Sequence, residues 1–306
     1  MPYLALGIGI LSLSFSALFA RWANAPGPVI AFYRISIATL VLAPAFLWRR
    51  HAASRDAEMK SVSLGWGILV FPLLGGLFTA LDHAVWNTAV NNTTAANATL
   101  LGNTAPLWVA LASWLIFHEH LTRLFWIGLA FAMGGAAVVL GTDFLYHPAF
   151  GWGDVLALLA GFFYACYFLV TQIGRQKLDT LSYIWLVDLT SSLLLLATCV
   201  LLGISLIGYP PQTYLAFLGA ALVPQVIGYL AIAYALGHLP ASVVSPTMIL
   251  QPMLTAFLAI PLLGEMLQPA QWLGGLAVLA GIYMVHYSRE AGKQSKSEAE
   301  ETPTTA

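Results

Sequence analysis

The chain carries a series of apolar blocks, each about 18–24 residues long, which is the length that crosses a bilayer as an α-helix. Hydrophobic residues make up 59% of the 306 residues and charged residues only 8%, whereas soluble domains average about 25% charged residues. A transmembrane β-barrel would alternate apolar and polar residues, but runs such as Ile8–Ala20 and Leu193–Leu202 do not alternate. The sequence therefore predicts an all-α integral membrane protein.

We expect ten transmembrane helices. The expected spans lie near Tyr3–Ala20, Pro28–Trp48, Leu64–Val90, Thr94–Phe117, Thr122–Gly141, Trp152–Gly174, Leu181–Leu202, Tyr214–Leu236, Pro240–Leu263 and Gln268–Tyr287. They divide the chain into a first five-helix repeat over 1–141 and a second over 142–288. The last segment, 289–306, is rich in Lys, Ser, Glu and Thr and predicts a disordered tail.

The distribution of Lys and Arg predicts the orientation of the chain in the membrane. With the N-terminus inside, the inner segments hold Arg49, Arg50, Arg55, Lys60, Arg123, Arg175, Lys177, Arg289, Lys293 and Lys296. The outer segments hold only Arg21. Because positively charged loops stay on the cytoplasmic side, we expect a multi-pass protein of the cell membrane with both termini and the tail in the cytoplasm.

The two halves share a pattern of residues at a constant spacing of 146 positions (106 to 252, for example). The first-half positions are Ala95, Pro106, Ala110, Glu119, Leu121, Trp126, Gly128 and Gly135, and they recur as Ala241, Pro252, Ala256, Glu265, Leu267, Trp272, Gly274 and Gly281. Five spans per half is an odd number, so the second copy enters the membrane upside down. Inverted repeats of this kind place a substrate site at their interface near the midplane.

The second half ends in a pattern that resembles the end of an EamA-type repeat. Its residues are Pro240-Ala241-Ser242, Pro252, Gly264-Glu265, Gly274 and Gly281. The first half carries the pattern more loosely, with His118 where Gly264 stands. The chain thus resembles the drug/metabolite transporter superfamily over the whole membrane region. The resemblance implies a ten-helix exporter of small metabolites, and one branch of that superfamily exports amino acids, notably aromatic ones.

Four side chains of the third expected helix share one face: Thr79, Asp82, His83 and Trp86. The repeat spacing maps this face onto the eighth helix, where it includes Tyr229. Charged groups at bilayer depth are costly and usually serve a pathway, so we interpret these residues as candidates for binding substrate in a central cavity. They could instead hydrogen-bond one another and hold helices together.

The fourth and ninth helices offer Thr99 and Asn103 on one side and Ser245 on the other. Their polar groups could bind a substrate's amino or carboxyl group, or bond to their own helix backbone. Tyr164 of the sixth helix could stack on a planar substrate or pack in the membrane.

Matched prolines, Pro106 and Pro252, each remove a backbone hydrogen bond. We expect them to bend the fourth and ninth helices as a cavity wall or hinge.

Two further groups are ambiguous from sequence alone. Arg34 either extends its guanidinium outward to the membrane surface or has a structural or carboxylate-binding role inside, and Asp188 lies at the inverted counterpart position of the seventh helix. Glu119 and Glu265 precede helices, where a carboxylate caps free amides, so we interpret both as helix caps. The glycine pairs Gly134-Gly135 and Gly274-Gly275 predict close helix packing.

The sequence favours a secondary transporter that exports amino acids, aromatic ones above all, and related metabolites. His118-Glu119-His120 lacks the spacing of a metalloprotease site, and the chain has no phosphate-binding Gly-Lys-Ser/Thr loop. We therefore expect no metal, cofactor or enzymatic activity. The net charge of −1 says nothing about a partner, and no basic patch in the sequence suggests nucleic acid. Expected partners are the bilayer and a small molecule, and a monomer is compatible with the sequence. The alternatives are a carrier of sugar phosphates or drugs, and a membrane enzyme or lipid-handling protein.

Overall fold

The computed structural model describes residues 1–55, 66–90, 92–93, 95–140, 151–263 and 269–301, and all regular structure within them is helical. In chain order the helices are α1 (Pro2–Ser14), α2 (Ser16–Ala23), α3 (Gly27–Arg55), α4 (Trp66–Val90), α5 (Ala95–Gly102), α6 (Ala105–Leu115), α7 (Arg123–Leu140), α9 (Trp152–Arg175), α10 (Thr180–Leu201), α11 (Pro211–Ala220), the π-helix η1 (Ala221–Tyr229), α12 (Leu230–Leu236), α13 (Ala241–Thr247), α14 (Leu250–Leu263) and α15 (Pro269–Glu301).

Helical segments of membrane-spanning length and hydropathy dominate the described residues. Eight segments qualify: Pro2–Ala23, Gly27–Ala52, Trp66–Trp86, Arg123–Leu140, Trp152–Arg175, Thr180–Leu201, Pro211–Leu236 and Ala241–Leu262. Large apolar side chains remain exposed along their outer faces, Leu40 at 72% and Leu201 at 85% among them. A lipid environment is the natural partner for such a surface. The predicted all-α membrane fold is therefore confirmed.

The other two expected spans correspond to the pair α5 and α6 and to the first part of α15. The count of ten crossings thus stays a prediction, as does the orientation of the termini. α15 is helical as far as Glu301, within the segment for which the sequence predicts disorder, and residues 302–306 lie outside the described part.

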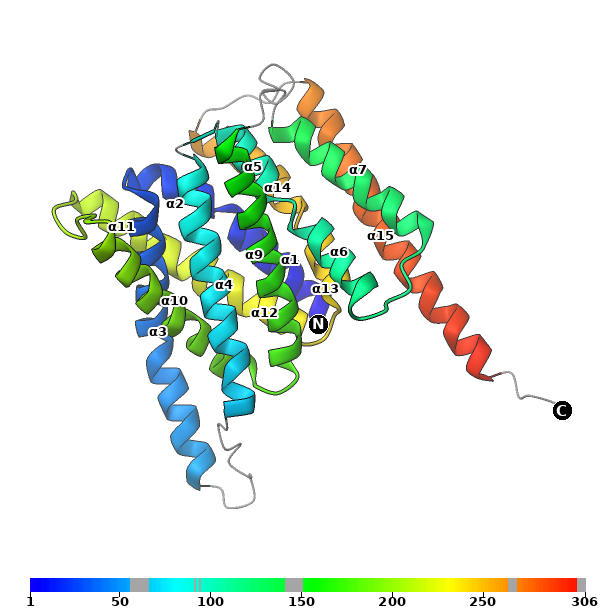
Figure 1. Cartoon of the computed structure of the whole chain (residues 1–306), viewed down its shortest axis with the longest axis horizontal. Coiled ribbons are helices and arrows are strands. Elements are labelled where there is room, and N and C mark those ends of the chain that lie inside the picture. Colours follow the sequence, from blue (N-terminus) through cyan, green and yellow to red (C-terminus); the bar gives the residue numbers. More distant parts are fainter. Residues whose placement is uncertain (56–65, 91, 94, 141–150, 264–268, 302–306) are drawn as a thin grey trace.

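The helices form a bundle in which segments from both halves interleave (Figure 1). α4 packs against α9 and α10, and α10 also packs against α3. α7 packs along α15 at one side of the bundle. Helices of the first half thus find their main partners in the second half, so neither half forms a core by itself.

Glycines let α7 and α15 approach closely, as the paired small residues predict. A Cβ at Gly128 would lie 2.7 Å from the Gly281 carbonyl oxygen, and one at Gly135 would lie 2.5 Å from the Gly274 carbonyl oxygen. Gly128 and Gly274 are repeat equivalents, and so are Gly135 and Gly281. Gly128 thus contacts the repeat equivalent of Gly135, and Gly135 contacts the repeat equivalent of Gly128. Two copies related by a two-fold axis meet in this reciprocal way.

Both repeats carry a broken helix at nearly the same place. The chain leaves helical geometry between α5 and α6 in the first half, and between α13 and α14 in the second. Pro106 and Pro252 lie in the first turn of the helix that follows each break, where a missing N–H costs little. The helices are thus interrupted just before the prolines instead of being bent at mid-helix as expected, and a hinge role for the prolines stays a prediction.

Candidate functional site

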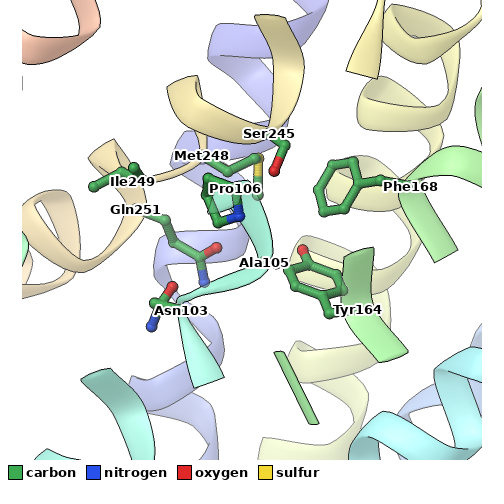
Figure 2. Close-up of a pocket in the computed structure, with 9 residues that line it drawn as sticks. All are labelled: Asn103, Ala105, Pro106, Tyr164, Phe168, Ser245, Met248, Ile249 and Gln251. Carbon is green, nitrogen blue, oxygen red and sulfur yellow. The ribbon is translucent and has the colours of Figure 1, made fainter. Parts of the chain in front are cut away.

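A small cavity lies beside the two helix breaks. Its walls come from the break between α5 and α6, from α6, α9, α13 and α14, and from the break between α13 and α14. The lining residues are Asn103, Ala105, Pro106, Tyr164, Phe168, Ser245, Met248, Ile249 and Gln251 (Figure 2). The free space fits about one water molecule, so the helices must part before a metabolite can enter.

The wall of the cavity combines apolar side chains with hydroxyl and amide groups. Ser245 is fully buried, and its Oγ has no hydrogen-bond partner among the described residues. In Figure 2 the hydroxyls of Ser245 and Tyr164 both point into the space between Pro106 and Phe168. A buried unpaired hydroxyl costs about 1–3 kcal/mol, so Ser245 is a group that a ligand or a water would satisfy.

The structure thus brings four of the predicted site residues to one cavity: Asn103, Pro106, Tyr164 and Ser245. Asn103 donates from its amide nitrogen to the Thr99 carbonyl oxygen at 2.8 Å. This is the hydrogen bond to the preceding helix backbone that the sequence left open as an alternative to substrate binding. Thr99 itself lies outside the lining, as does Pro252.

Sequence reasoning missed the other five lining residues, which are Ala105, Phe168, Met248, Ile249 and Gln251. Gln251 Nε2 donates to the Leu13 carbonyl oxygen at 3.3 Å, at the break between α1 and α2. Its amide therefore links a break in the first half to a break in the second. The signal available in the sequence was a polar residue directly before a repeat-matched proline.

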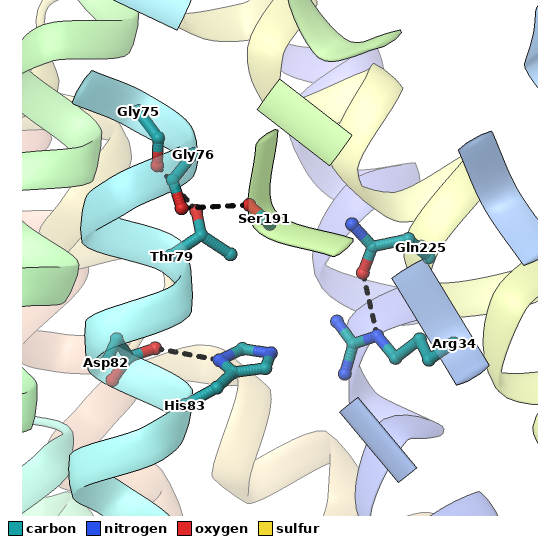
Figure 3. A network of polar contacts seen from close by, with 8 residues as sticks. All are labelled: Arg34, Gly75, Gly76, Thr79, Asp82, His83, Ser191 and Gln225. Atoms are coloured by element: carbon teal, nitrogen blue, oxygen red, sulfur yellow. Dashed lines mark hydrogen bonds and ion pairs between the residues drawn. The ribbon is translucent and has the colours of Figure 1, made fainter. Parts of the chain in front are cut away.

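A second group of predicted residues lies on α4 (Figure 3). Asp82 Oδ2 lies 3.3 Å from His83 Nδ1, and both side chains are about one-sixth exposed. In Figure 3 the His83 ring points away from α4, toward the side where Arg34 and Gln225 lie. Thr79, on the same face, is buried and donates to the Gly75 carbonyl oxygen of its own helix at 2.9 Å.

Trp86 lies one turn further along α4 and connects the two groups of residues. A Cβ at Gly102 would lie 3.1 Å from Trp86 Cδ1, so the indole packs directly on the end of α5. Asn103 of the cavity wall follows Gly102 in the chain. The predicted helix face of α4 therefore reaches the cavity wall through Trp86.

Opposite α4, a buried row of polar side chains runs from α3 to α10. Arg34 Nε donates to Gln225 Oε1 at 2.7 Å, and Gln225 Nε2 donates to Asp188 Oδ1 at 2.8 Å. Gln225 and Asp188 are each 1% exposed. This row answers the question that the sequence left open, because Arg34 bonds inward to Gln225.

The π-helix η1 positions Gln225. Its sequence contains Pro224, which lacks the N–H of regular helical hydrogen bonding. π-Helical turns are frequent at functional sites. η1 ends at Tyr229, another predicted site residue, and the Arg34 guanidinium carbon lies 5.4 Å from the centre of the Tyr229 ring.

Tyr164 and Tyr229 join the cavity to the charged groups. Arg34 and Asp82 both interact electrostatically with each of these two tyrosines. Tyr164 also lines the cavity. Tyr164 therefore belongs to the cavity wall and also lies near the charged side chains.

The interpretation of Glu119 as a helix cap is wrong. α7 begins at Arg123, and the Thr122 hydroxyl accepts from Phe125 N at 3.2 Å, so Thr122 is the capping residue. Glu119 Oε2 instead accepts from Ser242 Oγ at 2.7 Å and pairs with Arg289. The repeat-equivalent Glu265 lies outside the described residues.

Comparison with known proteins agrees with this architecture. The EamA-like transporter family matches residues 1–141 and 151–287. An uncharacterized transporter of Archaeoglobus fulgidus is 28% identical over 262 residues, covering 83% of this chain and 86% of that protein. The uncharacterized transporter YdfC of Bacillus subtilis is 25% identical over 285 residues, covering 89% of each chain.

A crystal structure of another protein shares the fold, with a TM-score of 0.75, 19% identity, and coverage of 93% of this chain and 96% of that one. The family match extends over nearly the whole chain and over both halves. This chain is a multi-pass membrane protein and belongs to the EamA-like transporter family.

Proposed function

We propose that this protein is a secondary transporter of the cell membrane that exports amino acids, aromatic ones above all, by alternating access to the cavity between its two halves. Both termini are cytoplasmic in this proposal, and ten helices cross the membrane. The observation that carries it is the buried Ser245 hydroxyl, which lacks a hydrogen-bond partner among the described residues and points into a cavity walled by helices of both halves.

The composition of the wall supports an amphiphilic solute. Phe168, Met248 and Ile249 supply apolar surface, and Tyr164 supplies a ring with a hydroxyl. An aromatic amino acid needs both kinds of contact, because its ring must leave water and its polar groups must keep hydrogen bonds. A sugar phosphate calls for several Lys or Arg side chains, and none lines this cavity.

The broken helices suggest how access alternates. The cavity lies beside the breaks of both repeats, so movement of α6 against α5, or of α14 against α13, changes its wall directly. Because the repeats are inverted, the same motion in the two halves opens opposite faces.

The test is uptake of labelled phenylalanine, tryptophan and leucine into liposomes that contain the purified protein, with and without a pH gradient. We expect saturable uptake that is stronger for the aromatic pair and lost in Ser245→Phe, which fills the cavity. The matched control is Ser205→Phe, at an exposed position between α10 and α11. Folded wild-type protein that takes up none of these amino acids would overturn the substrate assignment.

A further inference from the structure

Arg34 is a partly buried cation that forms no ion pair with a carboxylate of the described residues. No described carboxylate lies within 4 Å of its guanidinium, because Gln225 lies between Arg34 and Asp188. A guanidinium has five N–H donors, and one of them, Nε–H, is used by Gln225. The Tyr229 ring is another close neighbour, with its centre 5.4 Å from the guanidinium carbon. A cation at membrane depth is costly, so Arg34 is suited to receive an anion that arrives from outside the chain.

The row behind Arg34 fixes its position. Gln225 and Asp188 are almost fully buried, and Asp188 Oδ2 has no hydrogen-bond partner among the described residues. Asp188 orients the Gln225 amide by accepting from Nε2, which turns Oε1 toward Arg34. The amide thereby holds the guanidinium and leaves its positive charge in place, whereas a carboxylate at this position would neutralise it.

An anionic counterpart lies across the same space on α4. Asp82 Oδ2 lies 3.3 Å from His83 Nδ1. Arg34 lies seven residues from the start of α3, and Asp82 eight residues from the end of α4, which are neighbouring ends in Figure 1. At 1.5 Å per residue, both charges therefore lie about 10–12 Å from the same face of the bundle.

Two tyrosines lie near both of these charges. Each of Tyr164 and Tyr229 interacts electrostatically with both Arg34 and Asp82. Tyr164 also forms part of the cavity wall. A cation, an anion and an apolar cavity thus meet around one pair of aromatic rings.

We propose that Arg34 binds the carboxylate of the substrate and Asp82 its ammonium group, so that this site selects α-amino acid zwitterions. Gln225 and Asp188 are positioning residues that keep the guanidinium in place with its charge available. The inference rests on the proposed function and adds the groups that recognise the two charges. The apolar side chain of the substrate then extends past Tyr164 toward Phe168.

The experiment is competition against labelled phenylalanine uptake in liposomes holding the full-length protein. Phenylalanine amide lacks the carboxylate, and 3-phenylpropionate lacks the ammonium group. We expect Arg34→Gln to weaken binding of phenylalanine and 3-phenylpropionate at least about tenfold while leaving phenylalanine amide unchanged. Asp82→Asn should weaken phenylalanine and phenylalanine amide and spare 3-phenylpropionate.

The positioning role has a separate test. The double variant Gln225→Glu with Asp188→Asn keeps one carboxylate and one amide in the row but exchanges their places. The carboxylate then lies next to Arg34 and pairs with it. We expect loss of 3-phenylpropionate binding with Arg34 intact, whereas Arg49→Gln, at an exposed pair with Asp179, leaves all three ligands unchanged.

Equal weakening of all three ligands by Arg34→Gln, or none, would overturn the assignment of Arg34. Size-exclusion profiles and the charge-preserving Arg34→Lys separate loss of folding from loss of recognition. If wild-type protein takes up no amino acid, the proposed function fails independently. In that case, thermal stabilisation by 3-phenylpropionate of the wild type but not of Arg34→Gln would still support the carboxylate site. Absence of stabilisation in both proteins would overturn that site.

Discussion

Glu119 Oε2 and Arg289 Nη2 lie 2.6 Å apart and join the segment after α6 to α15. The same carboxylate oxygen accepts from the Ser242 hydroxyl in the first turn of α13. Nearby, the Gln172 side chain of α9 accepts from the Ala241 backbone N–H. This end of the bundle is therefore tied across the two halves, directly beyond the cavity that Ser245 lines.

Breaking this ion pair should loosen that end of the bundle. Glu119→Gln removes the charge but keeps the shape, and a charge-assisted hydrogen bond contributes about 1.5–3 kcal/mol. We expect roughly tenfold or greater loss of amide protection over 241–249, measured by hydrogen–deuterium exchange. Arg49→Gln, which breaks the exposed pair with Asp179, is the matched control. Unchanged exchange over 241–249 would show that the pair does not hold this end closed.

The glycine contact between α7 and α15 should be intolerant of a single methyl group. Gly135→Ala places a Cβ 2.5 Å from the Gly274 carbonyl oxygen, whereas Gly134→Ala meets nothing within 4 Å. Overpacking costs about 1–3 kcal/mol. We expect the first variant to lower the thermal unfolding midpoint in detergent by several degrees and the second to leave it unchanged or raise it. Equal midpoints for the two would contradict the packing argument.

Replacing Ser245 should separate stability from transport. Its hydroxyl is buried and has no hydrogen-bond partner in the described part of the chain. Ser245→Ala should therefore leave stability unchanged or raise it by about 1 kcal/mol while reducing uptake. Ser191 offers the opposite case, because its hydroxyl donates to the Gly76 and Val187 carbonyl oxygens. Ser191→Ala should lower stability. Thermal unfolding and liposome uptake check both variants, and full uptake by Ser245→Ala would remove the hydroxyl from the site.

The prolines after the helix breaks should control turnover more than affinity. Pro106→Ala and Pro252→Ala give each break a backbone N–H and greater freedom, so we expect slower transport with little change in the substrate Kd. Pro210→Ala, at the start of α11, serves as control. The maximal uptake rate and the Kd from equilibrium binding distinguish the effects, and a change in Kd alone would argue against a hinge.

Hydropathy was sufficient to predict the membrane fold, and the small-residue strings predicted close helix packing, although not that α7 and α15 are the partners. Both signals are local or periodic: a spanning helix needs only a long apolar block, and glycines at small spacing permit contact wherever the partner lies. Asn103, Pro106 and Ser245 were predicted from their paired positions in the repeat, and Tyr164 because an aromatic ring with a hydroxyl can bind a planar substrate. All four line the cavity.

Partner choice is where sequence reasoning failed. Glu119 was read as a cap because it precedes a helix, but its partners Ser242 and Arg289 lie more than a hundred residues away. Thr79 shares a face with Asp82, yet its hydroxyl bonds to its own backbone. A hydroxyl or carboxylate can satisfy itself in several ways, and only the surrounding helices select one.

The sequence by itself determined that this chain spans the membrane as helices and contains two related halves, because backbone polar groups in lipid must be satisfied within each segment. The tertiary structure decided which side chains meet: Gln225 between Arg34 and Asp188, and Gln251 against the break at Leu13. Those contacts join residues far apart in the chain, so they depend on how the helices pack and not on any pattern within one helix.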